Sequence, residues 1–206
     1  MIGGGLAGIL TAALLRESGV DVVVLEADRI GSGQTENTTA KVTGQHGMLY
    51  HRLEQTLGQD SARLYAGAGQ QALEWYQQLI WDRRIDCEWE RLPAYLYTVR
   101  SEAELLREFA AQERAGLPVR LTEETGLPFP TAGAVRCENQ AQLHPLRLLR
   151  ALAEELTIRE GTRVLEAEGD QLRTTGGTVR AEHIIFCCHF PFVNAPGYYF
   201  LRMHQE

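Results

Sequence analysis

The sequence has little positive charge, and this shortage excludes one broad class of partner. Its 206 residues carry 20 lysines and arginines against 27 aspartates and glutamates, which gives a formal net charge of −7. Proteins that bind nucleic acids need a basic surface for the phosphates, and no cluster of basic residues stands out along this chain. The charge balance therefore predicts that nucleic acid is not a partner.

Cysteine pairs and long hydrophobic runs are also lacking. None of the four cysteines forms a C-x-x-C pair, which argues against a metal site. We interpret the adjacent Cys187 and Cys188 as small buried residues at the end of a strand. No apolar run reaches the roughly 20 residues of a membrane-spanning helix, and no basic segment of a signal peptide precedes the apolar stretch Leu6–Leu15. These observations predict a cytoplasmic protein without a membrane span.

Glycine, by contrast, is concentrated where the chain opens. Gly3, Gly5 and Gly8 follow the G-x-G-x-x-G spacing, and the apolar helical run Leu6–Leu15 begins within this motif. The first glycine permits a tight turn from strand to helix, and the second lets a pyrophosphate approach the backbone. The third lets the helix pack close to the strand, and the helix N-terminus then offers free N–H groups to an anion. The spacing predicts a site for a dinucleotide.

The segment after the helix completes this pattern. Ser18 and Gly19 end the helix, Val20–Leu25 is rich enough in valine to form a second strand, and Glu26 follows it directly. Glu26 lies eighteen residues after Gly8, where a carboxylate can accept both hydrogens of a ribose diol. The alternative is a strand–helix–strand turn that holds no ligand.

A long loop rich in glycine, threonine and serine follows, over residues 27–53. Loops of this length inside a compact domain usually have a function. Thr38, Thr39 and Ala40 could open a short helix whose N-terminus faces the same anion. The alternative is a surface loop rich in capping residues.

Two residues of this loop are candidates for catalysis. Lys41 is the only lysine of the chain and could lie near the electron-rich end of a redox ring, with a solvated surface lysine as the alternative. His46 is the histidine best placed for a role in an active site. We expect His51 to face solvent or to cap a helix.

The remaining sequence alternates between helical and strand-like segments. We expect helices at residues 61–84, 101–116 and 142–156, with a single helical turn at 122–126, and strands at 87–90, 94–99, 119–121 and 132–137. Three short strands at 162–168, 171–174 and 178–180 predict a β-meander. We also expect residues 163–165 to lie beside 22–25 in a parallel sheet, and residues 183–188 to form a buried parallel strand.

The glycine motif and its surroundings resemble a known family. The segment GGGLAGILTAALLRESGVDVVVLEADRIGSGQT is similar to the flavin fingerprint of the FAD-dependent D-amino-acid oxidase family, which includes glycine and sarcosine oxidases. The segments TENTTAKVTGQHG and HFPFVNAPGYYFLRMHQE are similar to a subgroup that often carries a C-terminal Rieske iron–sulfur domain. The resemblance implies an α/β fold in which a Rossmann-like FAD-binding domain, residues 1–85 and 138–206, is interrupted by an inserted α+β substrate domain with an antiparallel sheet, residues 86–137.

The resemblance also implies FAD as the cofactor, with contacts that can be assigned to single positions. They are Gly3, Gly5, Leu6, Ala7 and Gly8 at the pyrophosphate; Glu26, Ala27 and Asp28 at the adenosine ribose; Thr38, Thr39, Ala40 and Val42 along the pyrophosphate and the isoalloxazine ring; Val164 at the adenine through its backbone; and Cys187 near the dinucleotide. His46 is similar to a histidine that faces the flavin in relatives of sarcosine oxidase. The closing strand ends in Cys187-Cys188-His189, whereas the family usually has Ala-Thr-Gly or a near variant.

The activity that the resemblance implies is oxidation of a carbon that bears an amine or a hydroxyl group. A hydride would pass from an amino acid or a similar small molecule to the flavin, with oxygen or a redox carrier as the electron acceptor. Lys41 would stabilise the reduced flavin, and His46 would orient the substrate or accept a proton. Only two residues precede the glycines and no helix follows the last strand, so we expect a fragment truncated at both ends. The alternatives are a catalytically inactive nucleotide-binding fragment and a protein that binds NAD.

Overall fold

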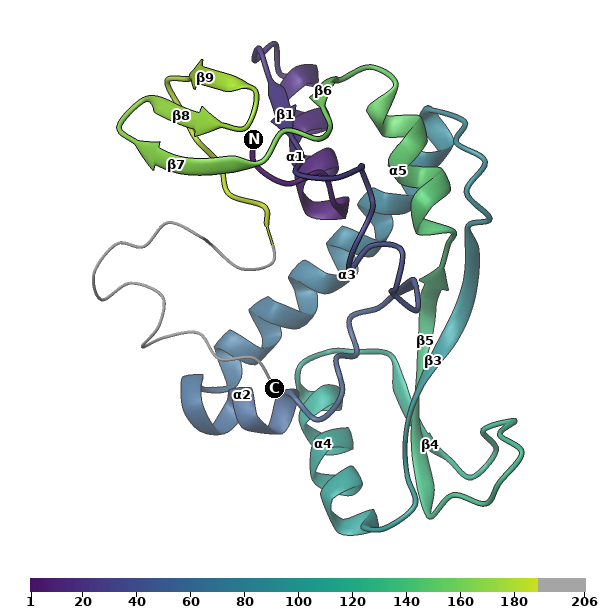
Figure 1. Cartoon of the computed structure of the whole chain (residues 1–206). Coiled ribbons are helices and arrows are strands. Elements are labelled where there is room, and N and C mark those ends of the chain that lie inside the picture. Colours follow the sequence, from purple (N-terminus) through teal and green to yellow (C-terminus); the bar gives the residue numbers. More distant parts are fainter. Residues whose placement is uncertain (189–206) are drawn as a thin grey trace. The chain divides into compact units, whose positions relative to one another are not determined.

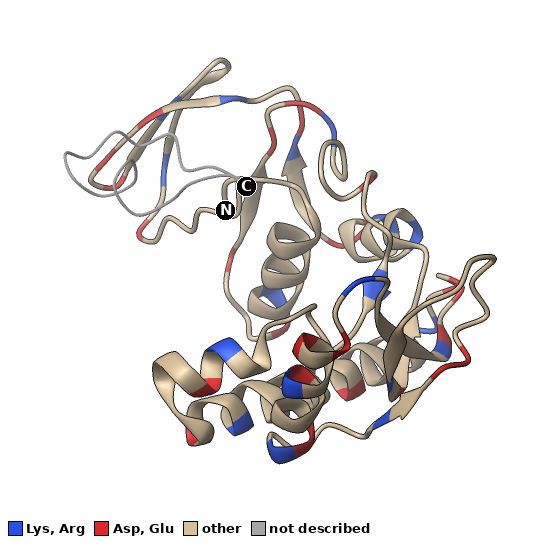
Figure 2. Ribbon diagram, turned by 90° about the horizontal axis from the view of Figure 1, so that it is seen from below, with Lys and Arg blue, Asp and Glu red and all other residues tan. Residues whose placement is uncertain are grey.

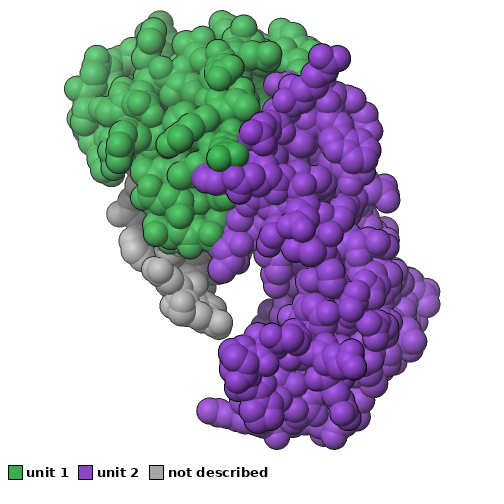
Figure 3. All heavy atoms as spheres, turned by 90° about the vertical axis from the view of Figure 1, so that its right-hand side faces the viewer, with its two compact units in different colours: residues 1–38, 145–206 green, residues 39–144 purple. Residues whose placement is uncertain are grey.

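The computed structural model describes residues 1–188, and the chain divides into two compact units (Figures 1 and 3). The first unit consists of Met1–Thr38 together with Pro145–Glu206, and the second is the continuous segment Thr39–His144. The chain therefore changes units after residues 38 and 144, whereas the sequence suggested domain boundaries after residues 85 and 137. Residues 39–85 belong by their contacts to the same unit as the expected insertion. The assignment of FAD-binding and substrate domains stays a prediction.

The first unit is built around helix α1, Leu6–Glu17, which follows the glycine turn directly (Figure 1). Its buried positions carry mainly small side chains, so that neighbouring backbone can approach closely. Helix α5, Pro145–Ala153, packs against α1 and buries three leucines at helical spacing, Leu148, Leu149 and Leu152. The glycine motif thus lies at the N-terminal end of a helix, as its sequence predicts.

The parallel strand pair of this unit differs from the expected one. Strand β1, Val23–Leu25, pairs in parallel with β6, Thr157–Arg159, and not with residues 163–165. The expected pairing is therefore wrong. Strand β6 has a single half-buried apolar side chain, Ile158, between two exposed polar residues, and so it lacks the apolar pattern of a central strand. Strand β1 is held on its other side by an isolated parallel bridge between Leu25 and Ile2.

A three-stranded meander follows in the first unit, as the sequence predicts. Strand β7, Val164–Glu168, pairs with β8, Gln171–Thr174, which pairs with β9, Gly177–Arg180, and both pairs are antiparallel. The core of this part contains Ile2, Leu25, Val164 and Leu172. Val164, at the start of β7, is buried in this core.

The expected buried strand at residues 183–188 is wrong. The structure has only an isolated parallel bridge between Phe186 and Ile2, although Ile2 exchanges two backbone hydrogen bonds with Ile185 and Cys187. The side chains of Ile185 and Phe186 are each 37% exposed. The apolar composition of residues 183–188 was therefore not sufficient evidence that the segment is buried. The aromatic stretch after it lies outside the described residues.

The second unit is an antiparallel sheet with three helices. Its central strand is β5, Gly133–Gln142, which pairs with β2, Lys41–Val42, with β3, Glu90–Thr98, and with β4, Val119–Thr122. The helices are α2, Tyr50–Leu57; α3, Gln59–Asp82; and α4, Glu102–Arg114. Their small side chains pack with Tyr50 and with Cys137 of the central strand into one core. The sequence predicted these elements except α2 and β2, although it divided β3 into two strands and ended β5 at residue 137.

Strand β3 is continuous, whereas the sequence suggested two strands on either side of Pro93. The register shifts at Pro93, where Leu92 pairs with Gln140 but Ala94 pairs with Cys137. This shift is a β-bulge in β5 at Asn139, whose φ is +59°. Proline has no N–H for the ladder, and Pro93 lies on the edge strand β3 opposite this bulge, where a sheet tolerates it.

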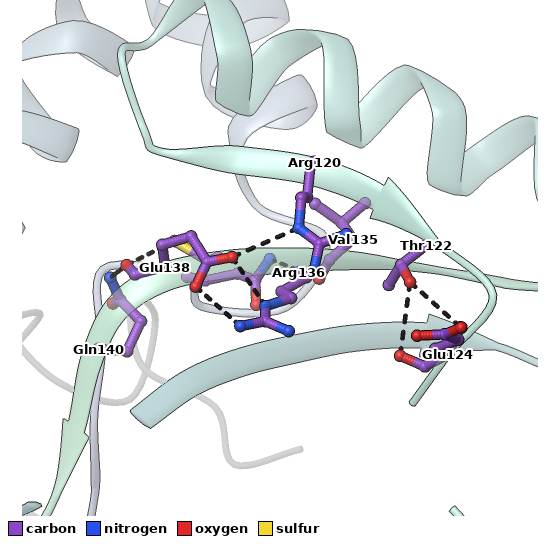
Figure 4. Close-up of polar contacts among 9 residues, drawn as sticks. Arg120, Thr122, Glu124, Val135, Arg136, Glu138 and Gln140 are labelled. Carbon is purple, nitrogen blue, oxygen red and sulfur yellow. Dashed lines mark hydrogen bonds and ion pairs between the residues drawn. The ribbon is translucent and has the colours of Figure 1, made fainter. Parts of the chain in front are cut away.

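Two local features of this unit also correct the sequence-based expectations. The expected helical turn at 122–126 is absent, because Thr122 still belongs to β4 and its hydroxyl accepts the N–H of Glu124 at 3.1 Å (Figure 4). The sequence also predicts a capping box from Ser101 and Glu104. Ser101 is the N-cap residue of α4, but its side chain makes no capping hydrogen bond.

Charged residues are spread over both units without a basic stretch among the described residues (Figure 2). On β4 and β5, Glu138 accepts hydrogen bonds from Arg120 and Arg136 (Figure 4). The hydrogen bond from Arg136 is the main cause that lowers the pKa of the Glu138 carboxyl. In residues 1–188, none of the helices combines the length and the apolar character that crossing a membrane requires.

Candidate functional site

The first unit contains a cavity of about 940 Å³ at the glycine turn. Of the residues that the sequence suggested as cofactor contacts, the cavity is lined by Gly3, Gly5, Leu6, Ala7, Glu26, Ala27, Val164 and Cys187. They come from the turn before α1, the end of β1, the start of β7 and the segment that bridges to Ile2. The structure therefore brings together residues that are up to 184 positions apart in the chain.

Glycine is required at two positions of this turn for steric reasons. A Cβ atom on Gly8 would lie 1.9 Å from the carbonyl oxygen of Gly3, a distance at which the helix could not keep its place. Gly3 itself has φ +106°, and a Cβ there would lie 2.8 Å from the backbone of Cys187. Gly8 does not line the cavity. Its role in the structure is to let α1 pack against the turn.

The N-terminus of α1 opens on the same cavity. Gly5 is the N-cap residue and has no side chain to bond the free N–H groups of the first turn. The hydroxyl of Thr35 accepts the N–H of Leu6 at 3.2 Å, while the first turn contains no acidic residue. The positive end of the helix dipole therefore faces a space without a competing carboxylate on the helix itself. This arrangement suits an anion such as a phosphate.

Glu26 lies directly beside the glycines, as the sequence predicts. One carboxylate oxygen, Oε2, accepts the N–H of Gly4 at 2.7 Å, and the other, Oε1, accepts the N–H of Asp28 at 2.8 Å. Two backbone donors from different parts of the chain thus fix the carboxylate at the cavity wall. Each oxygen keeps lone pairs for further donors, such as the hydroxyls of a sugar. Asp28 does not line the cavity, and its carbonyl accepts the N–H of Gly161.

Several lining residues escaped the sequence analysis. They are Ile2, Leu25, Ser32, Gly33, Gln34, Thr35, Thr162, Arg163, Leu165, Phe186 and Cys188. Ser32 to Thr35 belong to the segment after Glu26 that was recognised only as a polar loop. Arg163 is the arginine among them. The sequence analysis assigned a cofactor contact to the next residue, Val164, but not to Arg163. The one available signal was its position at the start of the meander.

The other candidate residues are located outside this cavity. Thr38 ends the first unit without lining the cavity, while Thr39, Ala40, Lys41, Val42 and His46 belong to the second unit. The expected short helix at 38–40 is absent. Ala40 has φ +56°, and the chain continues directly into strand β2, which pairs with Gln142 and Ala141. An extended strand offers no helix N-terminus to an anion.

The loop around His46 is anchored in the second unit by buried hydrogen bonds. The N–H of Gly44 donates to Gln140 Oε1 at 2.8 Å, and the carbonyl of Gly44 accepts the hydroxyl of Tyr50 at 2.7 Å. The side-chain amide of Gln45, which is 1% exposed, donates to Gln112 Oε1 at 3.1 Å and to the carbonyl of Val135 at 3.2 Å. The loop is therefore fixed from three elements, and it leaves His46 exposed.

Two further findings limit the chemistry of the described residues. All four cysteines are free thiols. Burial raises the pKa of the Cys187 and Cys188 thiols, so these thiols stay protonated and weakly nucleophilic. Within residues 1–188, no group of three or more histidine, cysteine, aspartate and glutamate side chains is arranged to hold a metal ion.

Comparison with known proteins gives a consistent result. The family model described as "DAO: FAD dependent oxidoreductase" matches residues 1–206. The chain is 35% identical to the protein named "Putative Rieske 2Fe-2S iron-sulfur protein YhfW" of Bacillus subtilis (strain 168), over 100% of this chain and 43% of that protein. It is 27% identical to gamma-glutamylputrescine oxidoreductase of Escherichia coli (strain K12), over 90% of this chain and 47% of that protein.

Solved structures show the same fold. The crystal structure of glycine oxidase from Geobacillus kaustophilus superposes with a TM-score of 0.71 at 22% identity, over 88% of this chain and 52% of that chain. That of L-proline dehydrogenase from P. horikoshii has a TM-score of 0.67 at 18% identity, over 87% and 49%. This chain spans about half the length of the curated relatives that it matches.

Proposed function

Because the chain belongs to the DAO family of FAD-dependent oxidoreductases, we propose that it is the FAD-binding part of an enzyme that oxidises a carbon bearing an amine or a hydroxyl group. The substrate is an amino acid or a similar small molecule. Relatives named for glycine, L-proline and gamma-glutamylputrescine support an amine-bearing carbon. Bound FAD supplies a ring that accepts a hydride from such a carbon.

The observation that carries the proposal is the glycine turn with Glu26 at its edge. Gly3 and Gly8 leave no space for a Cβ, which keeps the turn tight, and Gly5 leaves the end of α1 without a side chain. The residues present fit a dinucleotide, because the helix end suits its pyrophosphate and the carboxylate suits the hydroxyls of its ribose. Leu6 and Ala7, the first two residues of α1, both line the cavity, and the N–H of Leu6 also donates to the hydroxyl of Thr35.

The proposal assigns each of the suggested cofactor contacts to one part of FAD. Gly3, Gly5, Leu6, Ala7 and Gly8 form or support the pyrophosphate site, and Glu26, Ala27 and Asp28 lie at the ribose. Val164 meets the adenine with its backbone, since its side chain is buried in the core. Cys187 lies at the cavity wall. Thr38, Thr39, Ala40 and Val42 lie along the pyrophosphate and the isoalloxazine ring.

Lys41 and His46 are the proposed residues near the reacting end. A lysine near the flavin stabilises negative charge on the reduced ring, since an ammonium is a compact positive charge. His46 orients the substrate or exchanges a proton with it. The electron acceptor is oxygen or a redox carrier, and the relative named for a Rieske iron–sulfur protein supports a carrier. The free cysteines support a location in the reducing cytoplasm.

Titration of the chain with FAD tests the proposal. We expect binding that quenches flavin fluorescence and that weakens about 10-fold or more in Glu26→Gln, because hydrogen bonds to a charged acceptor contribute about 1.5–3 kcal/mol. Glu168→Gln, an exposed residue at the end of β7, is the matched control and should bind FAD like the unchanged chain. Thermal unfolding of both variants checks that the fold is retained. Absence of binding, or equal affinity in both variants, would contradict the proposal.

A further inference from the structure

The imidazole of His46 contacts the side chain of Tyr65, a residue that the sequence did not suggest for the site. The hydroxyl of Tyr65, on α3, lies 3.0 Å from Nδ1 of His46, and the two rings meet edge to face with centroids 5.8 Å apart. Tyr65 in turn meets the ring of buried Tyr50 edge to face, also at 5.8 Å. The position of Tyr65 is therefore fixed on its inner side by the core of the second unit.

The backbone of His46 is fixed independently of its ring. Gly44 and Gln45, the two residues before it, are buried and are held by Tyr50, Gln112, Gln140 and the carbonyl of Val135. An exposed histidine on a loop would normally sample several side-chain rotamers. Here both the backbone and Nδ1 are constrained, which leaves Nε2 as the free end of the ring.

The chemistry of the two groups decides the direction of this hydrogen bond. A neutral imidazole has one N–H donor and one bare nitrogen that accepts. A phenol O–H is a stronger acid than an imidazole N–H, and a bare imidazole nitrogen is a better acceptor than a phenol oxygen. The favoured arrangement therefore has the Tyr65 hydroxyl donating to Nδ1, which requires the proton of the ring to be on Nε2.

We propose that Tyr65 is a positioning residue that holds His46 as the neutral Nε2–H tautomer, so that His46 presents a hydrogen-bond donor to its ligand. The identity of that ligand rests on the proposed function, whereas the tautomer of His46 does not. A donor at Nε2 suits an oxygen or nitrogen atom that carries negative charge, such as a carboxylate of the substrate or an electron-rich atom of the flavin ring. It also selects between the two roles suggested for His46, because a ring in this state orients its ligand and does not accept a proton from it.

The surroundings of His46 agree with a neutral ring. Although His46 is exposed as a whole, partial burial of its ring lowers its pKa, and the positive charge of Lys41 on β2 lowers the pKa further. The hydroxyls of Tyr65 on α3 and Tyr50 on α2 also lie beside the loop, and burial raises the pKa of Tyr50. The carboxylate of Glu108 on α4 accepts the N–H groups of Tyr50 and His51. The pKa of His46 is shifted only by burial and by Lys41, and both favour the neutral ring.

Nitrogen-15 NMR of the full chain with labelled histidine tests the inference. Couplings between ring nitrogens and ring protons distinguish a protonated from a bare nitrogen, and loss of signals in His46→Gln assigns His46 among the six histidines. At pH 7.5 we expect His46 with Nε2 protonated and Nδ1 bare. Protonation of Nδ1, or an imidazolium ring at this pH, would overturn the inference.

Tyr65→Phe isolates the contribution of the hydroxyl. The phenyl ring keeps the edge contacts, while the neutral form of His46 loses a hydrogen bond. We therefore expect its measured pKa to rise by about 0.5–1 and its two tautomers to become mixed. Tyr97→Phe, at an exposed position of β3, is the matched control and should leave the signals of His46 unchanged. An unchanged His46 in Tyr65→Phe would overturn the inference. The measurement is made without FAD, so a failure to bind FAD would leave its outcome readable.

Discussion

Two glycines in helices show how strongly one Cβ atom can differ in its effect. Gly8 lies in α1, where a Cβ would come within 1.9 Å of the Gly3 carbonyl oxygen, whereas a Cβ on Gly67 in α3 would meet no atom within 4 Å beyond the backbone of its own helix. We expect Gly8→Ala to destabilise the chain by about 3 kcal/mol, the upper end for overpacking. We expect Gly67→Ala to stabilise it by roughly 0.5–1 kcal/mol, because alanine is the better helix former.

Urea unfolding of the two variants measures this difference. The comparison controls for helix propensity, since both substitutions exchange the same residues in a helix. FAD affinity gives a second reading, because Gly8→Ala displaces the end of α1 and Gly67→Ala does not. If Gly8→Ala were as stable as the unchanged chain, the close packing of α1 against the turn would be wrong.

Thr35 contacts the glycine motif in the structure, although the sequence analysis did not suggest it. Its hydroxyl accepts the N–H of Leu6, although 29 residues separate the two in the chain. We expect Thr35→Val to lower the free energy of unfolding by about 1 kcal/mol, as for the loss of a helix cap. Thr35→Ser keeps the oxygen and should retain the stability of the unchanged chain. Equal stability of Thr35→Val and Thr35→Ser would show that the hydroxyl has no capping role.

The residues around the glycine turn show which part of the site the sequence could predict. Gly3, Gly5, Gly8 and Glu26 form a pattern within 26 residues, so their spacing already indicated the turn and its carboxylate. Thr35 comes to the turn only through a tertiary contact, as do the lining residues from β7 onward. Local periodicity contains no information on which distant loop covers a helix end, and therefore the remaining wall of the cavity could not be predicted.

At the level of elements, α2 depends on a glutamate from another helix. Glu108 of α4 is 1% exposed, and its two oxygens accept the N–H groups of Tyr50 and His51 at 2.9 Å each. It also accepts the side-chain amide of Gln112 at 2.9 Å. The N-cap residue of α2, Leu49, has no side-chain acceptor, so the carboxylate of Glu108 replaces a local cap.

We expect Glu108→Ala to lower the free energy of unfolding by about 3–4 kcal/mol, because it leaves several buried donors without an acceptor. Glu104→Gln, an exposed position one turn earlier in α4, should change stability by less than about 0.5 kcal/mol. Urea unfolding gives both values, and circular dichroism reports the loss of helix. A small effect of Glu108→Ala would mean that water replaces the carboxylate and that α2 does not depend on it.

This dependence explains why the sequence did not reveal α2. A helix whose N-terminus is capped from another element lacks the local serine, threonine, aspartate or asparagine that marks a start. Strand β6 was missed for a similar reason, because its pairing with β1 is set by tertiary structure and its side chains are mostly polar. The long helices α3 and α4 carry a periodic apolar stripe of their own, and their positions were predicted within two residues at each end.

For the whole molecule, the two compact units differ in how many segments of the chain they contain. The first unit needs two separate segments, whereas the second is continuous from Thr39 to His144. The second unit also has its own core, with Tyr50 from α2, Ala62 and Ala66 from α3, and Cys137 from the central strand. The segment 86–137, which the sequence suggested as an insertion, contains only part of these residues.

We therefore expect residues 39–144 to fold when they are produced alone and residues 86–137 to remain unfolded. The shorter segment lacks α2, α3 and β2 and loses Tyr50, Ala62 and Ala66 from the core, so its apolar burial cannot compensate the entropy of ordering the chain. Thermal unfolding followed by circular dichroism should show one cooperative transition for the longer segment only. A cooperative transition for residues 86–137 would instead support the boundaries suggested by the sequence. Failure of both segments would mean that the second unit folds only within the whole chain.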